Sequence, residues 1–274
     1  MRNYHQLIRD ILDEGEYRND RTGVGTYAVF GRQLRFDLNN GFPLVTTKHT
    51  SFRLIAAELL WFLSGSTNNE DLRELNGNDN PTIWEEWANE CGDLGPIYGQ
   101  QWRAWRHYDE EDRVVDEYDQ IEKLVEKLKR NPTDRGHVVS AWNVADLRDM
   151  ALRPCHYSFQ MYVGNSNHLS CIVNLRSSDV FLGLPYNVAS YALLTHMLAH
   201  VCGYGVGELI VNTGDTHLYA NAIEPAKTLL LRTPLDLPKL LIVGDVRNID
   251  DFKLDNLKLE GYWSRPAIKV AVAV

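Results

Sequence analysis

The sequence predicts an α+β fold, built as a single domain over residues 1–274. Segments with strand spacing and segments with helical spacing follow one another irregularly, unlike the regular alternation of a parallel α/β array. The chain contains no internal repeat, low-complexity tract or linker rich in Ser, Gly or Pro. Its composition, 44% hydrophobic and 24% charged, is that of a well-cored globular protein. We therefore expect one domain that combines helices with a sheet.

Apolar residues at helical spacing predict helices at residues 4–14, 51–64, 119–130 and 187–202. The first and third are amphipathic, and they end at Gly15 and before Pro132 respectively. The second begins after Ser51, which can cap it. It is apolar nearly all round, so we expect it to be deeply buried. The fourth is long and apolar.

Short runs rich in β-branched and aromatic residues predict strands at residues 137–142, 157–163, 169–175, 208–213 and 239–243. The four residues GNSN at 164–167 suit a hairpin turn that joins two of these strands. A hairpin makes its two strands antiparallel.

The formal net charge of −9 argues against a general nucleic-acid or membrane surface, because both need a positive field. We therefore predict no nucleic-acid and no membrane partner. An anionic ligand would need a local cluster of arginines. Arg21, Arg135 and Arg176 each lie next to turn residues, where their guanidinium groups can converge on a phosphate.

We expect a reduced, cytoplasmic protein. The first ten residues are polar and amphipathic, unlike a secretory signal. The longest apolar stretch, LIAAELLWFL, is too short to span a bilayer and contains Glu58. Four widely spaced cysteines without a CxxC pair favour free thiols over disulfides or a zinc site. His196 and His200 share one helix face but lack the glutamate of HExxH, so we expect no metal.

Cys155, in LRPCHYSF at 152–159, is the first candidate for chemistry. A buried cysteine is often inert packing. Pro154 fixes the backbone before it, however, and a nearby cation would populate the reactive thiolate. His156 is adjacent, but neighbours on a strand point to opposite faces, so its imidazole need not reach the sulfur. Arg153 or a distant arginine could supply the charge, and the residues alone leave packing and nucleophile as alternatives.

Glu58 is the second candidate, because it interrupts the apolar run AAELLWFLS. A carboxylate there is costly to bury unless it is paired, hydrogen-bonded or protonated. Structural pairing is one interpretation. An acid or base with a raised pKa is the other.

Two further clusters suit a nucleoside. Asn187 ends RSSDVFLGLPYN (176–187) and opens the predicted fourth helix. It can cap that helix, a role worth about 1 kcal/mol, or offer its carbonyl and amide to a uracil edge. In GDTHLY (214–219), His217 and Tyr219 share one face of an extended segment, which suits either a sugar or a hydrogen-bonded strand end.

Ten segments, in order and with fitting spacings, carry a resemblance to a known family. They are NDRTGVGT (19–26), GFPLVTTK (41–48), ELLWFLSG (58–65), TIWEEWA (82–88), GPIYGQQWRAW (95–105), VSAWNV (139–144), PCH (154–156), RSSDVFLGLPYNVASYALL (176–194), GDTHLY (214–219) and AIKVAVAV (267–274). Together they closely resemble the thymidylate synthase family, and the match covers essentially the whole chain.

The resemblance implies a large mixed β-sheet flanked by helices, and a homodimer that forms at the sheet. It also implies that 5,10-methylenetetrahydrofolate, as co-substrate, alkylates a pyrimidine nucleotide without a metal. In that scheme Cys155 adds to C6 of the pyrimidine, and C5 becomes the carbon nucleophile. The site must stabilise the enolate that develops at O4. After C5 has attacked the methylene and lost its proton, the folate leaves and its hydride completes the methyl group.

The resemblance also assigns roles to residues of this chain. Those for the nucleotide are the following: Arg21, Arg176 and Ser177 for the 5′-phosphate, Arg135 reaching it from the other subunit, Asn187 for the base, and His217 with Tyr219 for the 3′-hydroxyl. Arg176 would also favour the thiolate of Cys155. Glu58 and Tyr98 would organise water and proton transfers. The residues implied at the folate site are Ile83, Trp84, Trp87, Asp179, Leu182, Gly183, Tyr186 and the terminal Val274, which would close over the site.

The sequence departs from the family pattern in five places. One follows Lys48, where residues 49–51 read HTS and the family often has basic residues or histidine that serve the folate. Gly136 stands where a second arginine usually follows Arg135, which removes one contact to the phosphate. Leu175 replaces a glutamine, and Ala222 replaces a histidine. Tyr186 replaces a phenylalanine and brings a hydroxyl toward the folate ring.

The predicted reaction is the reductive methylation of dUMP to dTMP. The alternative is a sister activity, hydroxymethylation of dUMP or, less in keeping with Asn187, of dCMP, in which water replaces hydride. A thiol hydrolase using Cys155 and His156 would need a third orienting group. A silent nucleotide- or RNA-binding homologue is disfavoured because Cys155, Glu58 and Asn187 occur together.

Overall fold

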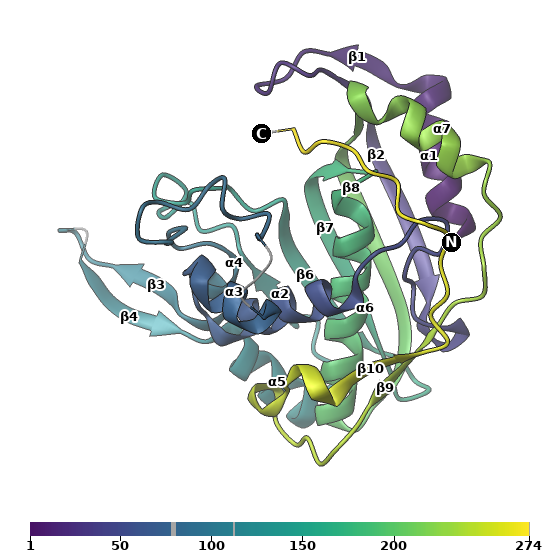
Figure 1. Ribbon diagram of the computed structural model, residues 1–274. Coiled ribbons are helices and arrows are strands. Elements are labelled where there is room, and N and C mark those ends of the chain that lie inside the picture. Colours follow the sequence, from purple (N-terminus) through teal and green to yellow (C-terminus); the bar gives the residue numbers. More distant parts are fainter. Residues whose placement is uncertain (78–80, 112, 274) are drawn as a thin grey trace.

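The computed structural model describes residues 1–77, 81–111 and 113–273, and its main feature is a mixed sheet of six strands (Figure 1). The strand order is β1-β2-β8-β7-β6-β5. These strands are β1 (Glu16–Arg18), β2 (Thr26–Asp37), β5 (Val138–Ser140), β6 (His156–Val163), β7 (His168–Asp179) and β8 (Gly205–Tyr219). Neighbours are antiparallel except β7 and β8, which are parallel. The predicted α+β class, with a large mixed sheet flanked by helices, is confirmed.

Helices cover one face of this sheet. The α-helices of the described residues are α1 (Arg2–Glu14), α2 (Phe52–Ser64), α3 (Asn69–Asn76), α4 (Tyr98–Arg103), α5 (Gln120–Arg130), α6 (Gly183–Cys202) and α7 (Ile223–Leu230). Helix α6 packs on β7 and β8, α1 packs on β2, and α2 packs against α6 (Figure 1). Two small hairpins, β3 (Trp105–Tyr108) with β4 (Val114–Tyr118) and β9 (Lys239–Ile242) with β10 (Leu257–Glu260), and short 3-10 turns at Leu38–Asn40, Ala220–Ala222, Ile249–Asp251 and Leu254–Asn256 complete the fold.

The core lies between the sheet and α6. Along β7, Leu169, Cys171, Val173 and Leu175 are buried, while the alternating residues face away and are only half-buried. On the other side, α6 is buried nearly all round, as its apolar sequence predicts. The sheet therefore presents one face to the core and leaves the other partly open.

Helix α6 begins at Gly183, four residues before the predicted start at 187. Pro185 lies in its first turn, where the missing backbone N–H costs nothing, so the proline does not delay the helix. Asn187 consequently lies one turn inside the helix. The interpretation of Asn187 as a helix cap is wrong.

The other three predicted helices are confirmed with small shifts at their ends. Ser51 caps α2, because its side chain accepts a hydrogen bond from the backbone N–H of Leu54 at 3.4 Å. Gly65 follows α2 with φ of 78°, a left-handed conformation that glycine adopts at low cost. As predicted, α2 is deeply buried, with Trp61 fully inaccessible.

Strands β6, β7 and β8 are longer than the sequence patterns predict, whereas β5 and β9 are shorter. The 164–167 turn joins β6 and β7 as expected, and Asn167 adopts φ of 60° there. Strand β2 was missed because Gly31 and alternating charged residues break its apolar pattern. Strand β8 extends as far as Tyr219, so GDTHLY is part of the sheet, and its long-range pairing with β2 overrides a weak local pattern.

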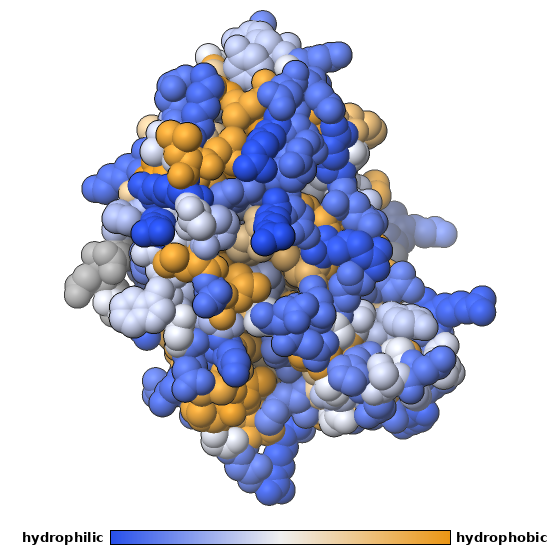
Figure 2. All heavy atoms as spheres, turned by 90° about the vertical axis from the view of Figure 1, so that its right-hand side faces the viewer, coloured by the Kyte–Doolittle hydropathy of each residue, from blue (hydrophilic) through white to orange (hydrophobic). Residues whose placement is uncertain are grey.

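The surface is mixed in character. On the face toward the viewer in Figure 2, hydrophobic side chains lie in separate patches among hydrophilic ones. Within the described ranges, none of the helices has the length and apolar character needed to cross a bilayer. The four cysteines, all in described segments, are free thiols.

Candidate active site

Most of the predicted site residues meet where β7 and β8 end and β6 begins. The two parallel strands align Ser177 with Asp215 and Asp179 with His217. Cys155 directly precedes β6, whose first residue pairs with Leu175 of β7. The first turns of α6 follow β7 immediately, so Asn187 is placed by the same strand end.

Arg176 is tied to the backbone of the cysteine loop. Its own N–H donates to the Cys155 carbonyl at 2.9 Å. Its Nε donates to the Pro154 carbonyl at 2.9 Å, and its Nη2 donates to the Arg153 carbonyl at 2.8 Å. The guanidinium also lies 5.7 Å from the ring centroid of Trp142. Two carbonyls thus hold the guanidinium beside the cysteine loop and a third holds the Arg176 backbone, while the residue remains exposed on its outer side.

Opposing influences act on the thiol of Cys155. Burial is the largest influence and raises the pKa of the thiol above its usual value, and Arg176, the Tyr98 hydroxyl and Arg21 each offset part of that rise. The backbone N–H of Cys155 donates to the Tyr98 hydroxyl at 2.7 Å. The cysteine is half-buried and is surrounded by the cations that a thiolate requires.

Glu58 projects from α2 toward the 81–88 loop. The indole Nε1 of Trp84 donates to its Oε1 at 2.9 Å. Burial raises the pKa of Glu58 to about 7, and the Trp84 hydrogen bond opposes that rise. A carboxyl group with a pKa near neutrality can both give and take a proton.

His217 is oriented by a carboxylate that the sequence interpretation missed. Its Nδ1 lies 2.8 Å from Oδ1 of Asp215, and the other carboxylate oxygen accepts from Arg18 at 2.8 Å. The rings of His217 and Tyr219 meet edge to face at 5.3 Å. Asp215 precedes His217 by two residues on a strand, and that spacing alone could have identified it.

Asp179 organises the turn that starts α6. Its Oδ1 accepts backbone hydrogen bonds from Phe181 at 2.9 Å and Leu182 at 3.1 Å. The ammonium of Lys48, which is buried, donates to the Phe181 carbonyl at 2.5 Å, and burial lowers its pKa to about 8. Leu182 and Gly183 are therefore held in a defined turn, with Asn187 half-buried on the next turn of the helix.

The aromatic residues of the 81–88 loop lie beside Glu58. Trp84 is buried and packs on Trp87 at 6.2 Å and on Tyr98 at 6.0 Å. Ile83 is 61% exposed, so an apolar side chain faces solvent at the edge of this cluster. Burial raises the pKa of Tyr186, and the Glu58 carboxylate raises it further, which places the two groups near each other.

Arg135 is not brought into the cluster. The side chain of Gln160 donates to the Arg135 carbonyl at 2.9 Å. Gln160 lies five residues along β6 from Cys155, a distance of about 17 Å for a strand rising about 3.4 Å per residue. Arg21, in contrast, is close enough to lower the pKa of Cys155. Val274 lies outside the described residues.

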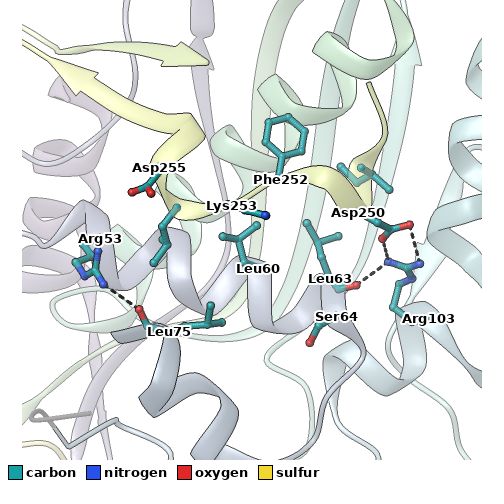
Figure 3. A pocket seen from close by; sticks show the side chains of 12 residues that line it. Arg53, Leu60, Leu63, Ser64, Leu75, Arg103, Asp250, Phe252, Lys253 and Asp255 are labelled. Atoms are coloured by element: carbon teal, nitrogen blue, oxygen red, sulfur yellow. Dashed lines mark hydrogen bonds and ion pairs between the residues drawn. The ribbon is translucent and has the colours of Figure 1, made fainter. Parts of the chain in front are cut away.

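A cavity of about 640 Å³ lies elsewhere, between α2 and the 249–255 segment (Figure 3). Leu60, Leu63 and Phe252 line it, with Arg53 and Lys253 at its edge. It is reached from a face of α2 that does not carry Glu58. Neither Cys155 nor Glu58 lines it, so we do not assign the chemistry to it.

The described residues include no group of three or more His, Cys, Asp or Glu side chains arranged to hold a metal ion. His196, one of the two histidines with metal-like spacing, is buried, and burial lowers its pKa to about 4. His200 instead lies 3.0 Å from the carbonyl of Val246 through its Nε2.

One protein-family model, described as thymidylate synthase, matches residues 2–274. The match includes every residue of the cluster around Cys155 and spans essentially the whole chain. Members of this family use methylenetetrahydrofolate as co-substrate. The chain therefore belongs to the thymidylate synthase family, whose members are folate-dependent enzymes that transfer a one-carbon unit to a pyrimidine nucleotide.

Proposed function

We propose that this protein is a thymidylate synthase that converts dUMP to dTMP with 5,10-methylenetetrahydrofolate through a covalent bond between Cys155 and pyrimidine C6. The observation that carries the proposal is the position of Cys155, whose thiol has Arg176, Arg21 and the Tyr98 hydroxyl around it. These groups offset part of the rise in pKa that burial causes, and the thiolate form of Cys155 is a suitable nucleophile for an electron-poor carbon.

The nucleotide is proposed to lie across the ends of β7 and β8. Arg21, Arg176 and Ser177 bind the 5′-phosphate, because guanidinium groups bind phosphate through paired hydrogen bonds. Asn187 binds the base, since its amide can accept from N3–H and donate to O4 of uracil. In this orientation the amide pairs with uracil, and it would have to rotate by half a turn to pair with N3 and N4–H of cytosine.

His217 and Tyr219 bind the 3′-hydroxyl. Asp215 supports this role because it holds Nδ1 of the imidazole and leaves Nε2 for the ligand. The two rings also meet at a fixed edge-to-face angle, which limits their freedom before the sugar arrives.

The chemistry divides among three groups of the chain. Cys155 supplies the electron pair that forms the bond to C6 and takes it back when the product is released. Glu58 and Tyr98 handle the protons: the enolate oxygen must be hydrogen-bonded while C5 attacks, and C5 must then lose its proton. With a pKa of about 7, Glu58 is present in both protonation states under ordinary conditions.

The folate site is proposed beside the nucleotide, where Trp84 and Trp87 offer aromatic faces to a pterin. Ile83 fits this proposal, because its exposed side chain gives an apolar edge that a bound ring would cover. Asp179 supplies a carboxylate for ring N–H groups. Leu182, Gly183, Tyr186 and the terminal Val274 complete the proposed lining, and closure of the chain end would exclude water.

We further propose that the protein acts as a homodimer joined through the open face of the sheet. Ile172 and Ile210 are register partners on that face, and Tyr162 and Val138 are 67% and 52% exposed there. A sheet face that carries apolar side chains needs a partner surface, and a second copy can supply a self-complementary one. The distance of Arg135 from its own Cys155 supports the idea that it serves the partner's site.

Mixed dimers test that arrangement. Arg135→Glu and Cys155→Ala should each be inactive alone, because one repels the phosphate and the other lacks the nucleophile. After subunit exchange, mixed dimers contain one intact site, and roughly a quarter of wild-type activity should return if pairing is statistical. Exchange without recovery of activity would show that Arg135 does not act across the interface.

Hydroxymethylation of the same nucleotide is the second candidate, and the observation that favours it is the Tyr186 hydroxyl near Glu58. A polar group at this place could retain a water molecule. That water, in place of the hydride of the folate, would then add to the exocyclic methylene. The folate product separates the two reactions, because methylation oxidises it to dihydrofolate and hydroxymethylation leaves tetrahydrofolate.

The test is therefore an incubation with methylenetetrahydrofolate and either dUMP or dCMP, followed by identification of both products. dTMP with dihydrofolate is the expected result from dUMP. Cys155→Ser should abolish turnover, whereas Cys91→Ser, at an exposed cysteine, should not. Turnover by Cys155→Ser, or tetrahydrofolate as the folate product, would overturn the proposal.

A further inference from the structure

A buried column of three rings lies directly behind the cysteine. Tyr98 stacks on His156 with centroids 4.1 Å apart and planes inclined by 25°. His156 in turn meets Tyr191 edge to face at 5.3 Å, and its Nδ1 lies 2.9 Å from the Tyr191 hydroxyl. All three side chains are buried. They come from α4, β6 and α6, so the column joins three elements beneath Cys155.

The hydrogen bonds at the top of the column have a clear direction. The N–H of Cys155 donates to the Tyr98 oxygen, so this hydroxyl still has its own proton to donate. Burial raises the pKa of Tyr98 well above its usual value, which keeps that proton in place. The same hydroxyl lowers the pKa of the Cys155 thiol, as a donor to the thiolate does.

The hydrogen bond at the base of the column fixes the imidazole. Burial lowers the pKa of His156 to about 3, so the ring is neutral, with one nitrogen protonated. Within the described part of the chain the Tyr191 hydroxyl bonds only to this ring, and its pKa is raised by burial. The Tyr191 proton therefore goes to Nδ1 and the ring proton lies on Nε2, because otherwise a buried hydroxyl proton would have no acceptor.

We propose that Tyr191 and His156 are positioning residues for the nucleophile: Tyr191 locks the orientation of the His156 ring, which holds the Tyr98 ring so that its hydroxyl stays on Cys155. His156 does not act as the base of a cysteine–histidine pair. The neutral ring stacks face to face on Tyr98, and its unprotonated nitrogen, Nδ1, accepts from the Tyr191 hydroxyl. No basic nitrogen of His156 is therefore left to take a proton from the sulfur. Its effect on the thiol passes through Tyr98.

The test measures thiol reactivity and needs no substrate, so it stands apart from the identity of the nucleotide. Alkylation of Cys155 by iodoacetamide is followed by peptide mass spectrometry across a range of pH. Exposed Cys91 in the same sample serves as the internal standard. In Tyr191→Phe the midpoint for Cys155 should move to higher pH, with alkylation about three- to tenfold slower at pH 7 and Cys91 unchanged.

Two further variants keep the result interpretable. His156→Phe retains a ring for stacking but loses the acceptor, so it should match Tyr191→Phe, and the double variant should be no slower than either. Tyr204→Phe is the matched control, since it removes a hydroxyl that donates at 2.6 Å to the Leu128 carbonyl, away from the cysteine. Its Cys155 profile should equal that of the wild type.

Kinetics with dUMP add a second readout. A positioning role predicts a lower kcat with KM within about twofold, because the nucleotide contacts are untouched. An unchanged Cys155 profile in natively folded Tyr191→Phe or His156→Phe would refute the proposal. Loss of reactivity with an unshifted midpoint would refute it too, since that would indicate general loosening of the fold.

Discussion

Replacing Glu58 with glutamine should make the protein more stable and much less active. The pKa of this carboxyl group rises from 4.5 to about 7 on folding because the group is removed from water. Each pKa unit corresponds to about 1.4 kcal/mol, so ionised Glu58 costs the folded state about 3 kcal/mol. This is an upper limit, because the residue keeps partial solvent exposure. Glutamine keeps an oxygen to accept from Trp84 and carries no charge to bury.

The gain in the free energy of unfolding of Glu58→Gln should depend on pH. Below pH 4.5 the carboxyl group is neutral in both folded and unfolded chains, and the variant should match the wild type. Between pH 4.5 and about 7 the folded wild type binds more protons than the unfolded chain, so its stability falls as pH rises. Above pH 7 the full difference should be present and constant.

Urea unfolding at pH 4, 6 and 8, at one fixed protein concentration, measures the difference in the free energy of unfolding between Glu58→Gln and the wild type. Glu74→Gln is the matched control, because Glu74 is exposed on α3 and its substitution should change stability little at any pH. Meanwhile kcat of Glu58→Gln should fall about 10²- to 10⁴-fold, as expected for a lost proton-transfer group. A stability difference that is absent at pH 8, or equal at every pH, would refute the assignment of Glu58 as a desolvated carboxyl group.

Three further changes test other parts of the site. Asp215→Asn should raise KM for dUMP about tenfold, because His217 loses the carboxylate that orients it. This rise in KM should vanish with a nucleotide that lacks the 3′-hydroxyl. An equal rise in KM for the two nucleotides would show that Asp215 does not act through His217. Arg176→Ala should shift Cys155 alkylation to higher pH, because a cation that lowers the pKa of the thiol is removed; an unshifted pH profile contradicts this role. Gly95→Ala should lower the free energy of unfolding by about 2 kcal/mol or more, since φ is +72° and the new methyl group would collide with the backbone carbonyl oxygen of Asp149. Urea unfolding with an unchanged midpoint would rule this out.

The helices with strong apolar periodicity could be predicted from sequence, whereas strand β2 and the full lengths of β7 and β8 could not. Helices α1, α2 and α5 obey local rules of spacing and capping, so a window of residues contains the information. Strand β2 draws its stability from pairing with β8, which lies almost two hundred residues away. The start of α6 at Gly183 was missed because Gly and Pro in its first turn resemble a loop.

Some residues of the candidate site could likewise be predicted from the sequence, and others could not. Cys155 and Glu58 stood out because each residue type is unusual in its local setting. Asp215 and Tyr191 did not, although one lies two residues from His217 and the other on an apolar helix. Their importance depends on which ring each contacts across the fold.

The fold class, the main helices, the family resemblance and the kinds of groups available for chemistry could all be predicted from the amino-acid sequence. All of these follow from short patterns, because side-chain spacing and local backbone preference act within a few residues. The surroundings of each group depend on the folded chain. In the folded chain Arg176 is hydrogen-bonded to the carbonyls of residues 153–155, and desolvation raises the pKa of Glu58. His156 is neutral and stacks on Tyr98, so it does not form a catalytic pair with Cys155. Burial and long-range contacts set pKa values and ring positions, and neither can be read from neighbours in the chain.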